Sequence, residues 1–194
     1  MSLLLLCLAG YLLGSLPFAV IVSRAFGLAD PRSYGSGNPG ATNVLRSGNK
    51  LAAALTLAGD AAKGWLAVWL ALLLSADPAA AALVGVAAFV GHVFPVFLKF
   101  KGGKGVATAL GVLLGLSAPL ALGAALCWLV VAAVTRYSSL AAIVTALLVA
   151  NASWLWLGEP RISACISILC AILIWRHEPN IRKLLAGTEG RIGR

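Results

Sequence analysis

Residues 79–98 read AAAALVGVAAFVGHVFPVFL, an apolar stretch without any Asp, Glu, Lys or Arg. A helix that crosses a membrane needs about 20 residues of this kind. The whole chain is 61% hydrophobic and 11% charged, with a mean hydropathy of +0.97. Similar apolar stretches cover residues 3–23, 51–74, 106–117, 119–134, 139–157 and 162–175. The sequence therefore predicts an all-α integral membrane protein with seven transmembrane helices, forming a single polytopic membrane domain over residues 1–194.

Basic residues fall almost entirely on one side of this seven-span arrangement. Of the fifteen Lys and Arg residues, only Arg161 belongs to the opposite side. Because basic loops stay on the cytoplasmic face, the sequence predicts an N-terminus outside and a C-terminus in the cytoplasm. This topology accounts for most of the net charge of +9, so we expect membrane lipid and no nucleic acid as its partner. The cytoplasmic set comprises Arg24, Arg32, Arg46, Lys50, Lys63, Lys99, Lys101, Lys104, Arg136, Arg176, Arg182, Lys183, Arg191 and Arg194.

The stretch 106–134 is interrupted only by Ser117-Ala118-Pro119, so it forms either two short spans or one long kinked helix. Lys104 before it and Arg136 after it both belong on the cytoplasmic face. An even number of crossings must then separate them. The charge pattern therefore favours two short spans.

The first polar loop on the cytoplasmic side is Gly35–Asn43, which reads GSGNPGATN. Its glycines permit a close approach of the backbone, and successive amide N–H groups can then converge on an anion. The pattern Gly-x-Gly-x-x-Gly alone is a weak dinucleotide signal, because no strand precedes it. The alternative is a flexible turn at the membrane edge. The residues that favour an anion site are Gly35, Ser36, Gly37, Asn38, Gly40, Ala41, Thr42, Asn43 and Arg46.

A second polar loop, Lys99–Gly105, reads KFKGGKG and precedes the next apolar stretch. Lys104 would lie near the N-terminus of a helix, where the helix dipole already favours an anion. The loop is not a Walker A motif, because Gly105 follows Lys104 where that motif has Ser or Thr. Membrane anchoring is the alternative, and it explains the other lysines well but the glycines poorly.

Two histidines and one charged pair are further candidates. His177 and Asn180 lie three residues apart, so they share a helix face if the helix continues past them. A short interfacial helix is expected after them. His92 lies deeper in its span, where a functional role and a packing role are both open. Asp60 and Lys63, at positions i and i+3, are expected to form a structural ion pair.

Metal chemistry finds little support in the sequence. The chain has six acidic residues, and they are scattered. No group of them has the spacing of metal ligands, so we expect neither a metal nor a cofactor. The His-x-x-x-x-Asp box and the Gly-x-Ser-x-Gly elbow are both missing from the sequence. The chain thus offers many groups that could bind phosphate and few that could act as a general base.

Three segments resemble one known family. Residues 35–43 (GSGNPGATN), 91–108 (GHVFPVFLKFKGGKGVAT) and 176–191 (RHEPNIRKLLAGTEGR) are similar to the bacterial acyl-phosphate:glycerol-3-phosphate acyltransferase family, often called PlsY. The resemblance covers essentially the whole chain. It implies acyl transfer from acyl phosphate to the 1-hydroxyl of sn-glycerol 3-phosphate, which gives lysophosphatidic acid and inorganic phosphate. It also implies a bacterial inner-membrane enzyme, monomeric, whose active site faces the cytoplasm.

The same resemblance implies roles for individual residues. Lys104, Ser36 and Arg46 would be catalytic, and the loop of residues 35–42 would bind the acyl phosphate. Asn43, Arg46, Lys104, His177 and Asn180 would bind glycerol 3-phosphate. Ser139 and His92 are further candidates. The resemblance also implies that the phosphate of the substrate itself accepts the proton. This fits the scarcity of side chains that could act as a general base here.

Two other classes of protein remain as alternatives at this stage. A transporter of a small organic phosphate or other anion would carry its binding groups near the membrane midplane, often within repeats. Here the polar groups gather at one edge of the spans, and no repeat is evident. A CDP-alcohol phosphotransferase would need clustered Asp residues for metal, and the sequence has no such cluster.

Overall fold

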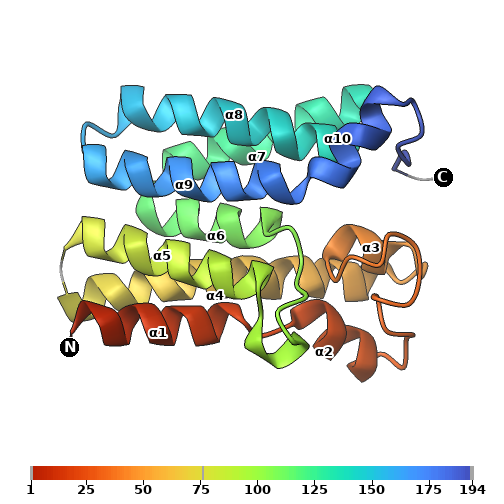
Figure 1. Ribbon diagram of the computed structural model, residues 1–194, viewed down its shortest axis with the longest axis horizontal. Coiled ribbons are helices and arrows are strands. Elements are labelled where there is room, and N and C mark those ends of the chain that lie inside the picture. Colours follow the sequence, from red (N-terminus) through yellow and green to blue (C-terminus); the bar gives the residue numbers. More distant parts are fainter. Residues whose placement is uncertain (1, 76, 193–194) are drawn as a thin grey trace. The chain divides into compact units, whose positions relative to one another are not determined.

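The computed structural model describes residues 2–75 and 77–192. All regular secondary structure in these residues is helical (Figure 1). The chain divides into two compact units, residues 1–116 and 117–194, and each is described by itself. The elements are α1 (Leu3–Gly14), α2 (Phe18–Ala25), α3 (Ala41–Leu45), α4 (Lys50–Ser75), α5 (Pro78–Val93), η1 (Val96–Leu98), α6 (Val106–Leu116), α7 (Ala118–Thr135), α8 (Ser138–Trp156), α9 (Pro160–Arg176) and α10 (Glu178–Leu185).

The described helices confirm an all-α membrane protein. Five segments are long and apolar enough to cross a membrane, and a sixth is added if α9 and α10, which meet at a bend of 54°, count as one span. Helix α6 is apolar but shorter. The five segments are Leu3–Ala25, Lys50–Ser75, Pro78–Leu98, Ala118–Thr135 and Ser138–Trp156. Each of the seven predicted apolar stretches thus corresponds to helix, while the number of crossings and the orientation stay predictions.

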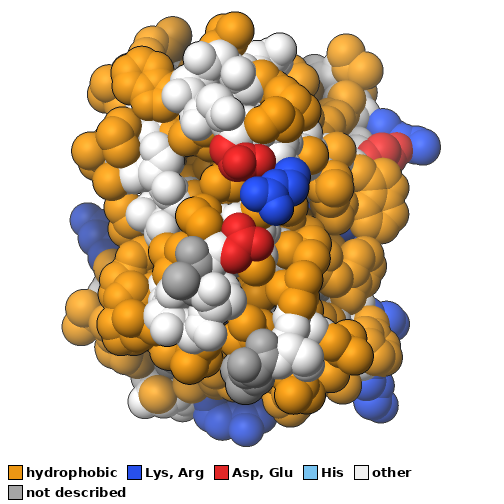
Figure 2. Space-filling model, turned by 90° about the vertical axis from the view of Figure 1, so that its left-hand side faces the viewer, with side chains coloured by type: hydrophobic (Ala, Val, Ile, Leu, Met, Phe, Trp, Pro, Cys, Tyr) orange, Lys and Arg blue, Asp and Glu red, His pale blue; other side chains and the backbone are white. Residues whose placement is uncertain are grey.

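The outer surface of the helices has the character of a lipid-facing surface. Leu155 is 90% exposed and Val134 is 79% exposed, although both are large apolar side chains. Water around so many apolar groups would be costly, at about 25 cal/mol for each Å² of apolar surface. Figure 2 looks along the helices onto one of their ends, where charged side chains are few. The exposed apolar side chains along the helices are consistent with burial in hydrocarbon.

Unit 1 is built on close approaches between helices. In Figure 1, α1, α4, α5 and α6 run side by side, with α2, α3 and the loop after α5 at one end. A Cβ on Gly14 would overlap the carbonyl of Ala88 in α5, and one on Gly111 would overlap the carbonyl of Ala61 in α4. Small residues of this kind let helices pack through their backbones, as is common in membranes.

The connection from α2 to α4 contains one short helix. This helix, α3, starts at Ala41 directly after Gly40 and has five residues. A turn over residues 46–48 follows it, and Gly48 adopts a φ of 85° there. Asn49 restarts the helical course as α4, and its Oδ1 accepts the N–H of Ala52 at 2.9 Å.

Unit 2 consists of α7, α8, α9 and α10. Ser117 and Glu159 cap α7 and α9, because their side chains accept the backbone N–H groups of Leu120 and Arg161. The chain bends at His177, and Pro179 lies in the first turn of α10. The expected short helix after the last apolar stretch is therefore present. Arg194, which the sequence analysis counted on the cytoplasmic side, lies outside the described residues.

Candidate active site

Asn43 organises the first glycine-rich loop in unit 1. Its Nδ2 donates to the carbonyl oxygens of Pro31 at 2.6 Å and Tyr34 at 3.1 Å. Its Oδ1 accepts the backbone N–H of Ser36 at 3.0 Å and a guanidinium N–H of Arg46 at 3.3 Å. The side chain is only 2% exposed. Because both ends of the amide hold the loop, Asn43 acts first as a scaffold, and its predicted contact with glycerol 3-phosphate stays a prediction.

The glycines of this loop meet a steric requirement at Gly35. This residue has a φ of 59°, a backbone conformation that favours glycine. A Cβ at this position would also overlap Oδ1 of Asn43. The Asn43 scaffold and Gly35 therefore depend on each other, and the turn presents Ser36 at the surface.

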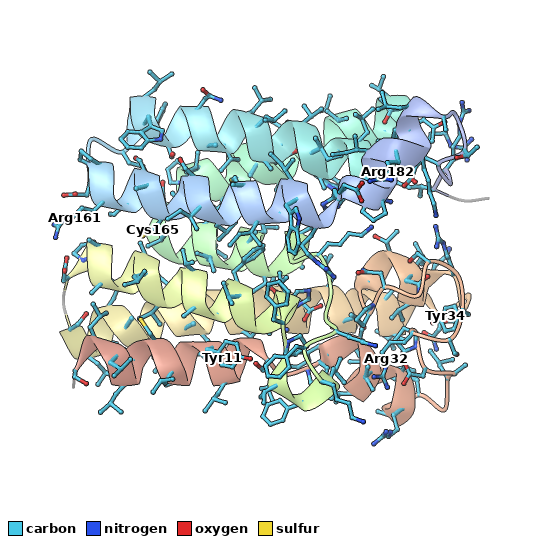
Figure 3. All side chains as sticks on the ribbon, viewed as in Figure 1. Tyr11, Arg32, Tyr34, Arg161, Cys165 and Arg182 are labelled. Carbon is cyan, nitrogen blue, oxygen red and sulfur yellow. The ribbon has the colours of Figure 1, made fainter. Side chains whose placement is uncertain are left out.

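Several predicted binding residues are exposed around the Asn43 scaffold. Ser36, Thr42 and Arg46 are exposed, whereas Asn38 is half-buried. Figure 3 shows Arg32 and Tyr34 on the same α2–α3 connection. Arg32 forms a two-pronged ion pair with Asp30, with its NH2 atom 2.6 Å from Oδ2. The hydrogen bond from Arg32 lowers the pKa of Asp30 below its ordinary value, so the carboxylate stays ionised and paired with Arg32.

The second glycine-rich loop packs on the C-terminal end of α5. The N–H of Gly102 donates to the carbonyl of Val93, and the N–H of Gly103 donates to the carbonyl of His92, each at 3.2 Å. These bonds satisfy carbonyl groups that a helix end leaves without partners. A Cβ on Gly102 would overlap the carbonyl of His92. The loop therefore needs glycine here, which membrane anchoring alone does not explain.

Lys104 lies between this packed segment and α6. It is half-buried and precedes Val106, the first residue of α6, by two positions. Gly105 between them has a φ of 85°, and a Cβ there would overlap the ring of Phe89. A Cβ on Gly103 would lie 3.2 Å from the carbonyl oxygen of Pro39, so the two glycine-rich loops meet. Unit 1 thus brings Lys104 and the Gly35–Asn43 loop to one region.

The predicted ion pair between Asp60 and Lys63 is confirmed. Nζ of Lys63 lies 2.8 Å from Oδ1 of Asp60, and both side chains are almost fully buried. The sequence analysis missed the third member of this group: Nδ1 of His92 lies 3.4 Å from the same carboxylate oxygen. His92 therefore lies behind the second glycine-rich loop, in contact with a charged pair of α4.

Unit 2 holds the other predicted binding residues. His177 is buried at the bend between α9 and α10, and its Nδ1 lies 2.8 Å from the carbonyl of Leu173. That distance assigns the Nδ1 proton to this bond, which fixes the orientation of the ring. The N–H of Asn180 donates to the carbonyl of His177 at 2.9 Å. The two residues thus lie on one turn, as their spacing predicted.

Glu189 joins two of these candidates and was not singled out from the sequence. Its Oε1 accepts hydrogen bonds from Oγ of Ser139 at 2.6 Å and from Nδ2 of Asn180 at 2.7 Å. The carboxylate therefore orients the side chain of Asn180. The only hint in the sequence is that Glu189 is an acidic residue in a strongly basic C-terminal segment.

The segment after α10 is fastened to the turn between α7 and α8. The N–H of Ile192 donates to the carbonyl of Arg136 at 2.7 Å, and the Arg136 guanidinium donates back to the carbonyl of Ile192 at 3.0 Å. Arg191 lies over the ring of Tyr137, 5.3 Å from its centre. Figure 3 shows Arg182 on α10 and Arg161 at the other end of α9. Apart from Arg161, the basic residues in the described part of unit 2 therefore gather at the end that carries His177.

The possible metal ligands in the described residues do not form a cluster. Within residues 2–75 and 77–192, no three His, Cys, Asp or Glu side chains come together as a metal site would require. The four cysteines form no disulfide and are buried or half-buried. Neither glycine-rich loop, residues 35–46 or 99–105, contains a carboxylate or a histidine. The charged side chains of these two loops are therefore all cationic: Arg46, Lys99, Lys101 and Lys104.

Fold and loops together define an integral membrane protein with cationic, glycine-rich loops. The family model described as glycerol-3-phosphate acyltransferase matches residues 4–187. A glycerol-3-phosphate acyltransferase of Aromatoleum aromaticum is 62% identical over 100% of this chain and 98% of its own length. One of Laribacter hongkongensis is 64% identical over 94% of this chain and 92% of its own. The chain belongs to the glycerol-3-phosphate acyltransferase family.

Solved structures agree with this assignment. A crystal structure of PlsY, described as an integral membrane glycerol 3-phosphate acyltransferase in its glycerol 3-phosphate form, matches with a TM-score of 0.93 and 38% identity. The lysophosphatidic acid form of PlsY matches with a TM-score of 0.92 and 36% identity. Each comparison covers 100% of this chain and 96% of the PlsY chain. The fold is therefore that of PlsY along its whole length.

Proposed function

We propose that this protein transfers a fatty acyl group from an acyl phosphate to the 1-hydroxyl of sn-glycerol 3-phosphate. The products are lysophosphatidic acid and inorganic phosphate. The observation that carries the proposal is the match over the full chain to PlsY, in forms described with glycerol 3-phosphate and with lysophosphatidic acid. The cationic loops of unit 1 support it independently, because both substrates carry a phosphate group.

The chemistry suits a site without a general base. An acyl phosphate is a mixed anhydride, so its carbonyl carbon is already activated. The 1-hydroxyl oxygen attacks that carbon, the bond from carbon to the bridging phosphate oxygen breaks, and the hydroxyl proton ends on the departing phosphate. The protein then contributes by holding the reactants in position and by stabilising the negative charge that builds on the leaving phosphate.

Unit 1 supplies the groups for the acyl phosphate. The loop of residues 35–42 binds its phosphate, with the side chains of Ser36 and Thr42 as donors. Lys104 and Arg46 neutralise its charge. The exposure of Ser36, Thr42 and Arg46 supports this role. The Asn43 scaffold supports it too, because a preorganised loop needs no reordering when the substrate binds.

Unit 2 supplies groups for glycerol 3-phosphate. His177 and Asn180 bind this substrate, and Ser139 lies with them through the shared carboxylate of Glu189. Hydrogen bonds fix the orientation of His177 and Asn180, which supports the assignment. A site recognises a substrate hydroxyl best with hydrogen-bonding groups that are oriented in advance. We expect the protein to act as a monomer.

The donor and the metal requirement are tested together. We expect purified protein to form lysophosphatidic acid from palmitoyl phosphate and glycerol 3-phosphate in excess EDTA, because no carboxylate cluster appears in the described residues. Palmitoyl-CoA should not replace palmitoyl phosphate. Product is measured by thin-layer chromatography of radiolabelled glycerol 3-phosphate. Activity that EDTA abolishes and magnesium restores would refute the metal-free mechanism, and turnover with palmitoyl-CoA alone would refute the donor.

The orientation in the inner membrane is also a proposal. Seven crossings, with α6 as a short one, place the N-terminus outside and both glycine-rich loops in the cytoplasm. In cysteine-free protein with Ser47→Cys or Ser75→Cys, a membrane-impermeant maleimide should label position 75 in intact cells and leave position 47 unlabelled. Both positions should react after the cells are broken open. The reverse pattern in intact cells would show the opposite orientation.

A further inference from the structure

A buried charged cluster joins four segments of unit 1 behind the second glycine-rich loop. It consists of Asp60 and Lys63 of α4 and His92 of α5. The side chains are 3%, 1% and 8% exposed. Asp60 contacts both partners through one carboxylate oxygen, Lys63 at 2.8 Å and His92 at 3.4 Å. We call this group the Asp60–Lys63–His92 cluster.

Lys63 extends the cluster to the break between α1 and α2. Its Nζ donates to the carbonyl oxygen of Leu16 at 2.8 Å and lies 5.9 Å from the centre of the Phe18 ring. Pro17 interrupts the helix at this point, and the carbonyl of Leu16 accepts the N–H of Phe18 at 3.1 Å as well as the bond from Lys63. Lys63 thus fixes the break to α4.

His92 extends the cluster to the loop that carries Lys104. Nδ1 of its ring lies toward Asp60, while Nε2 lies against Gly103, where a Cβ would overlap it. The carbonyl of His92 accepts the N–H of Gly103 at 3.2 Å. A small cavity is lined by Asp60, Lys63, His92, Pro39 and Gly103. The ring is therefore the direct link between the charged pair and the residue that precedes Lys104.

Stability alone is a poor reason for such a cluster. Burying an ion pair costs so much desolvation that apolar residues of similar volume are often as stabilising or more so. The ion pair instead restricts the positions of its partner side chains, because a charged contact allows few arrangements of them. In this cluster the contact with Asp60 fixes the orientation of the His92 ring. The ring lies against Gly103, the residue before Lys104.

We propose that the Asp60–Lys63–His92 cluster positions the Gly102–Lys104 segment, with the three cluster members acting as positioning residues and Lys104 as the group that meets phosphate. The expected effect on catalysis rests on the proposed function, whereas the expected effect on the order of the Gly102–Lys104 segment does not. The rate of amide hydrogen exchange reports directly on the order of this loop, because the N–H groups of Gly102 and Gly103 donate hydrogen bonds to the end of α5.

The test compares hydrogen–deuterium exchange in peptides that cover residues 99–105 between the full-length protein and its variants. His92→Ala should raise exchange there at least about tenfold, since local opening sets the rate. His92→Asn should restore much of the protection, because its amide nitrogen can take the place of Nδ1 toward Asp60. The double variant Asp60→Asn/Lys63→Met should behave like His92→Ala without leaving an unpaired buried charge.

Asp77→Ala is the matched control. It removes the N-cap at the opposite end of the same helix, where Oδ1 of Asp77 accepts the N–H of Ala79 at 3.0 Å. This variant loses a comparable structural contact of α5 but should leave exchange at residues 99–105 unchanged. If folded His92→Ala and the folded double variant both keep native exchange in this segment, the cluster does not position the loop.

Activity separates positioning from general loss of structure. His92→Ala should lower kcat/KM about tenfold or more in the native background, but less than about threefold in a Lys104→Ala background, because residues that act through one group are not additive. Equal losses in both backgrounds would overturn the role through Lys104. Changed exchange in a protein that forms no lysophosphatidic acid would support the positioning of the loop and refute the proposed function instead.

Discussion

Replacing Lys104 by alanine is expected to lower kcat/KM at least about a hundredfold, because one preorganised electrostatic contact is typically worth about 3–4 kcal/mol in a transition state. Lys104 is half-buried between Gly103, which is fixed to α5, and the start of α6. Its ammonium group can therefore meet the charge that builds on the leaving phosphate without first becoming ordered. Steady-state kinetics with palmitoyl phosphate and glycerol 3-phosphate would measure the effect.

Lys99→Ala is the matched control for this change. Lys99 belongs to the same loop and carries the same charge, but it is exposed, and both of its neighbours are larger than glycine. Its loss should change kcat/KM less than about threefold, as expected for a surface charge. Near-normal turnover of folded Lys104→Ala would mean that the lysines of this loop only anchor it at the membrane.

A comparable loss is expected for Asn43→Asp, although the two side chains have nearly the same shape. The new carboxylate would face the carbonyl oxygens of Pro31 and Tyr34, which now accept hydrogen bonds from Nδ2. Each buried group that loses its partner costs about 1–3 kcal/mol, and more if a charge is involved. The loop that carries Ser36 should then lose its order, with a fall in kcat/KM of about a hundredfold or more and a lower Tm in detergent.

Asn49→Asp makes the same chemical change in the same connection. Oδ1 of Asn49 accepts the N–H of Ala52 at the start of α4, and aspartate serves as an N-cap equally well. This variant should keep native activity and Tm. If Asn43→Asp were also indistinguishable from the native protein, the amide of Asn43 would not organise the loop.

The positions of the long helices follow closely from the sequence, because runs of apolar residues mark them. The predicted stretch 139–157 is α8, Ser138–Trp156, and the break noted at Ser117 separates α6 from α7. Lys63 was paired correctly with Asp60, since an i, i+3 spacing on one helix fixes which side chains can meet. Local geometry was sufficient for these features.

Contacts between distant segments could not be predicted in this way. The partners of Asn43 are two backbone carbonyls, whose positions depend on how the loop folds. Glu189 meets Ser139 across 50 positions of sequence. His92 reaches Asp60 from a different helix. Composition and spacing can mark such residues as polar and unusual, but only the packing of the helices decides which of them meet.

Acyl transfer itself is tested most directly by following the bridging oxygen of the donor. Palmitoyl phosphate labelled with ¹⁸O between carbon and phosphorus is incubated with purified protein and glycerol 3-phosphate, and the products are analysed by mass spectrometry. The account predicts equal amounts of lysophosphatidic acid and inorganic phosphate, with the label in the phosphate. Label retained in free palmitate, or consumption of the donor without lysophosphatidic acid, would contradict it.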